Sequence, residues 1–305
     1  MKAKMQIGLI SVDSRFPNYA LMKISAYHKS VGDKVEWASP LFGDYDIIYK
    51  SKIFTFTEDD NMIYNGRQIK GGTGYDIHSK LPTDIDKYNK LDYDIYPNCN
   101  FSIVFFSRGC IRKCPFCLVS EKEGNIRSVD VPNLNPKGEW IEVLDNNFFA
   151  NPNWKDAVSF LIDKKQKVNL HGVDIRIMNE EQAYYLNKLR LKNNIHIAWD
   201  LPNIDLEPKL KDVIKYINPN KMTCYVLVGY NSTIEQDLHR LSTLKKYGIT
   251  PFVMPYRDYN NERVPSQYEK DIARWANRRE LFKSMNFEDY MPRKGFACKE
   301  YLLNN

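Results

Sequence analysis

One stretch decides the fold of this chain: Phe101-Ser102-Ile103-Val104-Phe105-Phe106-Ser107-Arg108-Gly109-Cys110-Ile111-Arg112-Lys113-Cys114-Pro115-Phe116-Cys117. Its first six residues are apolar and rich in aromatic and β-branched side chains, which predicts a buried strand. The remainder carries Cys110, Cys114 and Cys117 at C-x3-C-x2-C spacing, so three thiolates can converge on one soft metal centre from a single loop. A four-iron cluster held by three thiolates keeps one iron free of protein ligands, where a small molecule can bind.

The loop resembles the signature of the radical S-adenosylmethionine (SAM) superfamily, C-x3-C-x-aromatic-C, with Phe116 as the aromatic residue. The resemblance implies a [4Fe-4S] cluster on Cys110, Cys114 and Cys117, with SAM chelated to the open iron through its amine and carboxylate. In that superfamily one electron cleaves SAM to methionine and a 5′-deoxyadenosyl radical, which abstracts a hydrogen atom from the substrate. A strand that leads directly into the cysteine loop is the order found in the superfamily's partial barrel.

Two alternatives stay open for the same cysteines. A structural zinc site needs four protein ligands, and Cys99 is the candidate for the fourth because His78 and His171 are distant in sequence. An ordinary electron-transfer iron–sulfur cluster is the other alternative. Either would make the chain a non-catalytic zinc- or iron–sulfur-binding protein.

Composition places the chain among ordinary globular proteins. It has 305 residues, 43% of them hydrophobic and 27% charged, which is enough for two domains. No run of eighteen apolar residues occurs, so no membrane span is expected. Six cysteines, three of them clustered, fit reduced thiols and metal binding, which predicts a cytoplasmic protein. The formal charge of +6 permits a nucleic-acid substrate without arguing strongly for one.

Residues 1–97 predict a small Rossmann-like α/β domain. Strand patterns at 6–12, 34–38, 45–49 and 68–74 accompany a helical pattern at 19–30. The turn Gly71-Gly72-Thr73-Gly74, followed by Leu81-Pro82, resembles part of the cobalamin-binding type of domain that precedes many radical SAM barrels. The loop at 12–18 lacks the histidine that ligates cobalt there, so a truncated, degenerate domain without cobalamin is expected.

Residues 98–258 predict a partial (β/α)6 barrel and residues 259–305 a helical C-terminal extension. The overall class is therefore α/β. Strands are expected at 101–107, 139–144, 168–177, 195–200, 222–229 and 250–255. Helices are expected at 154–163, 180–190, 208–217, 233–247 and 267–285.

In barrels of this kind the chemistry lies at the carboxyl ends of the strands. Asp145 and Asn146 follow the second strand and offer acceptors for the ammonium of SAM, although polar residues there are also common turn formers. The third strand carries Asp174 and Arg176. Arg176 could pair with the carboxylate of SAM, and the alternative is an Asp174–Arg176 ion pair without a ligand.

The later strands supply the remaining candidates for cofactor binding. Asp200 could contact the ribose hydroxyls or cap a turn. The resemblance gives Gly229 a close approach to the adenosyl group, and Tyr256 a place near adenine. Cys99, Cys224 and Cys298 are isolated in the sequence, which argues against a second cluster.

The expected function is therefore a radical SAM enzyme that uses an electron donor such as flavodoxin or ferredoxin. The residues that act on the substrate are not predicted. Three substrate classes remain: a nucleic acid or nucleotide, a peptide, and a small metabolite.

Overall fold

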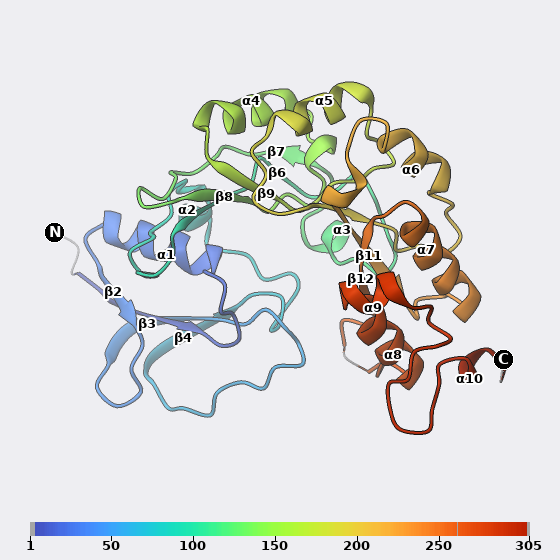
Figure 1. Ribbon diagram of the computed structural model, residues 1–305. Helices are drawn as coiled ribbons and strands as arrows, with labels where there is room; N and C mark the ends of the chain where they lie inside the picture. Colours follow the sequence, from blue (N-terminus) through green and yellow to red (C-terminus); the bar gives the residue numbers. More distant parts are fainter. Residues whose placement is uncertain (1–3, 261, 304–305) are drawn as a thin grey trace.

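The computed structural model describes residues 4–260 and 262–303, which form a mixed α/β structure with parallel sheets (Figure 1). The N-terminal unit (residues 4–97) has a four-stranded parallel sheet in the order β2-β1-β3-β4. Its elements are β1 (Gln6–Ser11), α1 (Tyr19–Ser30), β2 (Lys34–Trp37), β3 (Asp44–Ser51), β4 (Asn65–Gly71) and α2 (Thr83–Lys87). Helix α1 begins at the predicted residue because the side chain of Asn18 accepts a hydrogen bond from the N–H of Leu21.

The glycine-rich turn after β4 packs on the backbone of its own unit. A side chain at Gly72 would collide with the carbonyl oxygen of Lys52, and one at Gly74 with that of Phe54. The turn also reaches the cysteine loop, because Lys122 donates a hydrogen bond to the hydroxyl of Thr73.

The second unit (residues 98–258) contains six parallel strands that alternate with helices. They form two three-stranded sheets, β5-β8-β9 and β10-β11-β12. The N–H of Val173, just beyond β9, donates to the carbonyl of His196 in β10 at 3.3 Å, so the two sheets meet at this edge. Their strands are β5 (Phe101–Val104), β8 (Trp140–Val143), β9 (Lys167–Leu170), β10 (Ile195–Ala198), β11 (Met222–Val228) and β12 (Thr250–Pro255).

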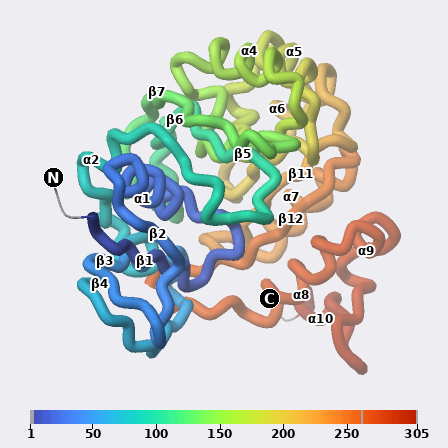
Figure 2. Tube along the Cα trace, turned by 90° about the vertical axis from the view of Figure 1, so that its left-hand side faces the viewer, coloured from blue at the N-terminus to red at the C-terminus, as the bar shows by residue number. Residues whose placement is uncertain are grey.

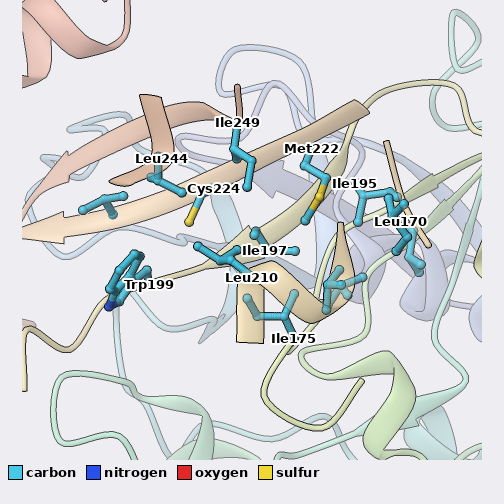
Figure 3. Close-up of a cluster of buried hydrophobic side chains, with 14 of the residues drawn as sticks. Leu170, Ile175, Ile195, Ile197, Trp199, Leu210, Met222, Cys224, Leu244 and Ile249 are labelled. Carbon is cyan, nitrogen blue, oxygen red and sulfur yellow. The ribbon is translucent and has the colours of Figure 1, made fainter. Parts of the chain in front are cut away.

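Helices cover one face of these sheets (Figure 1). They are η1 (Phe148–Ala150), α4 (Trp154–Lys164), α5 (Glu180–Lys188), α6 (Glu207–Val213), η2 (Pro219–Lys221) and α7 (Ile234–Lys246). Figure 3 shows the core between strands and helices, where Ile195, Ile197 and Cys224 meet Leu210 and Leu244. The predicted helices at 19–30, 154–163, 180–190 and 233–247 are confirmed, and the helix predicted over 208–217 is confirmed up to Val213, where α6 ends.

The prediction of one strand over 168–177 is wrong in its second half. Strand β9 ends at Leu170, and an irregular turn follows up to Asn179. Gly172 lies directly against the carbonyl oxygens of Asp145 and Asn146, and its own carbonyl accepts from the N–H of Phe148. The chain therefore leaves the sheet to pack on the loop after β8.

The cysteine loop is closed at its base by a short antiparallel pair, β6 (Ser107–Arg108) with β7 (Arg127–Ser128). One helical turn, α3 (Val119–Lys122), follows the third cysteine. Two hydrogen-bonded strand residues at each end hold the loop closed. The three cysteines therefore lie in a closed loop that follows β5.

The C-terminal segment contains α8 (Gln267–Ala276), α9 (Arg279–Ser284) and α10 (Glu300–Leu303) (Figure 2). The single helix predicted over 267–285 is wrong, because the side chain of Asn277 pairs with both backbone groups of Val253 and interrupts it. Trp275, Phe282 and Phe287 share the core of the second unit.

Residues 304–305 of the predicted extension lie outside the described residues. Within the described chain, no helix is long and apolar enough to cross a membrane.

Candidate metal and ligand site at the cysteine loop

The base of the cysteine loop is fixed by one acidic side chain. Glu123 accepts hydrogen bonds from the guanidinium of Arg108 at 2.7 Å, from the N–H of Gly109 at 2.8 Å and from the side-chain amide of Asn146 at 2.9 Å. Gly109 has φ +80° and lies against the carbonyl of Asn125, a position that excludes a side chain. The predicted residue Asn146 thus lies at the loop and braces it.

All three cysteines of the loop are free thiols and partly buried. The sulfur of Cys110 accepts from the N–H of Arg112 at 3.3 Å, and the side-chain amide of Asn147 lies 4.0 Å from it. Such N–H donors stabilise a thiolate ligand. Among residues 4–260 and 262–303, no three His, Cys, Asp or Glu side chains are gathered closely enough to hold a metal ion.

Burial raises the pKa of Cys114 and of Cys117, and for Cys114 the nearby Arg176 opposes this increase. Both thiols are therefore protonated at neutral pH. Metal ligation by these residues would release protons and draw the sulfurs together.

Asp145 lies beneath the loop and is nearly completely buried. One of its oxygens accepts from the N–H of Phe106 at 2.8 Å and the other from the hydroxyl of Ser107 at 2.5 Å. Burial raises the pKa of Asp145 to about 6, against the lowering effect of these hydrogen bonds. Both oxygens thus accept hydrogen bonds from the residues that lead into the cysteine loop.

A second carboxylate, Asp174, organises the cationic side of the site. It accepts from Nε of Arg176 at 2.6 Å, from Nη2 of Arg176 at 3.0 Å and from Nε of Arg112 at 3.0 Å. Burial would raise the pKa of Asp174, but the two guanidinium groups outweigh it and the pKa is lowered. The Asp174–Arg176 ion pair foreseen as an alternative exists, and it leaves Nη1 of Arg176 without a hydrogen bond in the described structure.

Four of the predicted residues line one small concavity: Cys114, Phe116, Arg176 and Asp200. Asp200 follows β10, and its buried Oδ1 has no hydrogen-bond partner among the described residues. Burial raises the pKa of Asp200 to about 6, although Arg240 and Arg176 lower it. An unpartnered buried carboxylate oxygen is costly, so this atom is suited to receive a donor from a ligand.

Arg240 of α7 positions Asp200. Its guanidinium donates to the carbonyls of Trp199 and Asp200 after β10, at 2.8 and 3.0 Å, and to that of Leu227 in β11 at 2.9 Å. It also pairs with Asp237 at 2.5 Å, and both side chains are about 99% buried. This interaction ties the carboxyl ends of two neighbouring strands together.

Aromatic rings continue from the cysteine loop to the last strand. Phe116 contacts Tyr230 with ring centroids 5.3 Å apart, and Tyr230 contacts Tyr256 at 4.8 Å. Gly229, with φ +78°, is covered by the ion pair of Arg263 and Glu269, whose atoms occupy the position that a side chain would take. Tyr256 is therefore connected to the loop, while Gly229 is shielded by C-terminal side chains.

The other cysteines lie in cores. Cys99 is buried in the hydrophobic core of the N-terminal unit, which also includes Ile103. Its thiol donates a hydrogen bond to the carbonyl of Phe101 at 3.3 Å. Cys224 and Cys298 are fully buried in the core of the second unit. Burial raises the pKa of all three.

Sequence reasoning missed Asn147, Tyr230 and Arg240. The run Asp145-Asn146-Asn147 contained a usable signal, because three polar residues in a row after a strand exceed what a turn needs. Arg240 gave none, since an arginine in an amphipathic helix ordinarily faces solvent.

No family model matches this chain, and no curated protein matches it either. The site therefore rests on its own geometry: three free thiols on one braced loop, a paired arginine, and two buried side-chain oxygens, of Asn147 and Asp200, without partners among the described residues. Three thiols on one loop suit a soft metal centre once they are drawn together, and the two unpartnered oxygens suit a polar organic molecule beside it.

Proposed function

We propose that this protein is a radical SAM enzyme with a [4Fe-4S] cluster on Cys110, Cys114 and Cys117. The single observation that carries the proposal is the concavity in which Cys114 and Phe116 of the loop meet Arg176 and Asp200. Those four residues follow three different strands. The cysteine motif by itself would place only Cys114 and Phe116 close together.

The arrangement of strands supports the proposal. Six parallel strands follow one another in chain order, and helices cover one face of them. We infer that β5, β8, β9, β10, β11 and β12 correspond to the partial (β/α)6 barrel of the superfamily, in a domain of residues 98–258. In parallel folds of this type ligands bind at the carboxyl ends of the strands.

The bound cluster would supply one electron that cleaves SAM to methionine and a 5′-deoxyadenosyl radical. Arg176, held by Asp174, would bind the carboxylate of SAM through Nη1. Asp200 would accept hydrogen bonds from the ribose hydroxyls, because its Oδ1 lacks a partner among the described residues. Phe116, Tyr230 and Tyr256 would enclose the adenine ring.

The remaining residues of the site would position the loop rather than bind SAM. Glu123 and Asn146 fix its base, and Asp145 holds the strand that enters it. Asn147 faces both Cys110 and Asp174, and its unpartnered oxygen is a candidate acceptor for the SAM ammonium. Asn147 would thus take the role expected of Asp145 and Asn146.

The second candidate function is a structural zinc site with Cys99 as the fourth ligand. Cys99 is buried in a different hydrophobic cluster and hydrogen-bonded to Phe101. Zinc ligation by Cys99 would require that core to open, whereas a cluster needs only the loop to adjust. The geometry therefore favours the three-thiolate centre.

The test is the metal content after anaerobic iron–sulfur reconstitution. We expect about four iron and four sulfide per chain, a brown colour, and an electron paramagnetic resonance spectrum of the reduced cluster that changes when SAM is added. Cys114→Ala should lose the cluster, while the matched control Cys99→Ala should keep it.

One zinc per chain that requires Cys99 would overturn the proposal in favour of the structural site. A stable cluster whose spectrum is unaffected by SAM would instead indicate an electron-transfer protein. An external electron donor such as flavodoxin or ferredoxin is expected to reduce the cluster in the cell.

A further inference from the structure

The face of the two sheets opposite the helices carries a row of polar and aromatic side chains. Along each strand, residues such as Ile141, Leu170 and Ile197 point to the helical core, so their neighbours point the other way. Those neighbours form a continuous row, here called the inner row: Glu142, Asn169, His171, His196, Tyr225 and Phe252.

Glu142 anchors the row at β8. This carboxylate is buried and accepts from the indole N–H of Trp140 at 2.6 Å, from the side-chain amide of Asn169 at 2.8 Å and from Nε2 of His171 at 2.9 Å. Burial would raise the pKa of Glu142, but these three partners lower it. Glu142 is thus charged and fully engaged, and it holds His171 by one ring nitrogen.

From His171 the row continues as a series of nearly parallel rings. The ring centroids of His171 and His196 are 5.4 Å apart with planes 17° apart, and His196 and Tyr225 are also 5.4 Å apart with planes 26° apart. Phe252 ends the series, edge-on to Tyr225 at 5.5 Å. One ring comes from the end of β9 and one from each of β10, β11 and β12.

Two polar atoms of the inner row are buried without a hydrogen-bond partner in the described part of the chain: Oδ1 of Asn169 and Nδ1 of His196. Asn169 as a whole is only 6% exposed. Leaving a buried polar atom unsatisfied is unfavourable, so two of them on one face point to partners that arrive from outside the protein.

The row is exposed at His171 and Phe252 and buried at Glu142 and Asn169. The side chain of His171 is 37% exposed and Phe252 is 45% exposed, while Tyr225 and His196 are partly buried. A large exposed ring beside unsatisfied polar atoms is typical of a binding surface, where flat apolar area supplies affinity and polar atoms supply orientation.

We propose that the inner row binds the substrate through a planar heteroaromatic group, whose ring packs on Tyr225 and Phe252 and whose polar edge pairs with Asn169 and His196. That the ligand is a substrate rests on the proposed function, but its binding to the row does not. A saturated polar ligand would leave the aromatic surface uncovered, and an apolar ring would leave the two buried atoms unpaired.

The test uses the full-length protein, without cluster or SAM, labelled with ¹³C in its five histidine rings. Uridine and nicotinamide serve as heteroaromatic probes, with benzyl alcohol and glucose as the apolar-edged and non-planar controls. Adenine compounds are left out because the proposed SAM site would take them. We expect saturable shifts of the His171 and His196 signals with uridine or nicotinamide, and none at His28, His78 or His239.

His196→Phe keeps a ring in the row but removes the unpaired nitrogen, and it should weaken probe binding about tenfold. The matched control His239→Phe, on the exposed side of α7, should leave the affinity unchanged. Equal shifts with all four compounds, no shift with any of them, or unchanged affinity in His196→Phe would each overturn the proposal. None of these results depends on the cluster, so they cannot be confused with a failure of the radical SAM assignment.

Discussion

The N-terminal unit and the second unit both use parallel sheets, but they treat buried polar groups differently. In the N-terminal unit Asn18 bonds to Ser51 at 2.9 Å and Lys50 to Asp60 at 2.6 Å, while His28 is held between Asp33 and Tyr49. None of the buried side-chain nitrogen or oxygen atoms described in that unit lacks a partner. The second unit has four such atoms, in Asn147, Asn169, His196 and Asp200.

The difference indicates where the molecule binds something. A sheet whose polar groups are all paired within the chain has no energetic need for a ligand. A sheet with unpaired buried atoms near its strand ends and on the face opposite the helices gains stability when a ligand supplies the missing partners. On this account the N-terminal unit is a scaffold beside the cysteine loop, and the second unit holds the chemistry.

The largest expected effect concerns the ion pair that is fully buried. Arg240→Met removes five hydrogen bonds and leaves the buried Asp237 without its guanidinium partner, so the free energy of unfolding should fall by about 3–5 kcal/mol. Lys50→Met in the N-terminal unit should cost less, because its partners Asp59 and Asp60 are partly exposed and can be hydrated. Urea denaturation measures both, with the exposed Lys215→Met as the control that should change little. A larger loss in Lys50→Met would contradict this ranking.

Two glycines with positive φ sharpen the comparison at the backbone. Gly72→Ala would collide with the carbonyl of Lys52, which cannot move without disturbing β3, and should cost about 3 kcal/mol. In Gly229→Ala the nearest atoms to the new Cβ belong to the side chains of Arg263 and Glu269, which can rotate away, so the cost should be about 2 kcal/mol. Gly295→Ala, with open space around it, isolates the conformational cost of about 1 kcal/mol. Equal losses at Gly72 and Gly229 would show that the ion pair over Gly229 is rigid.

The pH dependence of the unfolding free energy should also reveal the buried carboxylates of the second unit. Because the folded protein raises the pKa of Asp145 from 3.8 to about 6, the folded state binds more protons than the unfolded state between these values. Protonated Asp145 therefore contributes to the stability of the folded state below pH 4. This contribution, about 2–3 kcal/mol of unfolding free energy, is lost as the pH rises toward 6. Asp145→Asn should be more stable than the parent at pH 7 and equal to it at pH 3.5, as measured by thermal unfolding. A parallel shift at both pH values would exclude this cause.

The smallest expected loss of stability is at Asp200. Its Oδ1 has no partner in the described chain and burial raises its pKa to about 6, so Asp200→Asn should not lower the free energy of unfolding at pH 7. SAM binding should nevertheless weaken, as measured by isothermal titration. Asn18→Ala, which removes a satisfied cap of α1, should cost about 1–2 kcal/mol. If Asp200→Asn proves the more destabilising of the two, Asp200 has a structural role.

Much of the fold could be predicted from the sequence, because strand and helix periodicities are local. The helical pattern alone places the start of helix α1, and the structure shows that Asn18 caps it there. The predicted third strand is too long because Val173 and Ile175 continue the apolar alternation. The contact that ends the strand is made by Gly172 with Asp145, which is distant in sequence.

The candidate site likewise has residues that could be predicted from the sequence and residues that could not. Cys110, Cys114 and Cys117 could be found because their spacing is short, and Asp200 because it follows a strand. The burial of Asp145 under the loop depends on the register between β5 and β8, which no local pattern encodes. The inner row depends on alternation across four elements, and only Glu142 gives a sign of it, as an acid inside an apolar strand.

The central claim is tested most directly by anaerobic turnover of SAM. Reconstituted protein is mixed with SAM and dithionite, and 5′-deoxyadenosine is followed by mass spectrometry, with Cys114→Ala and Cys298→Ala alongside. The account predicts 5′-deoxyadenosine from the parent and from Cys298→Ala, and none from Cys114→Ala. A fully loaded cluster that neither binds SAM by spectroscopy nor yields 5′-deoxyadenosine would contradict it.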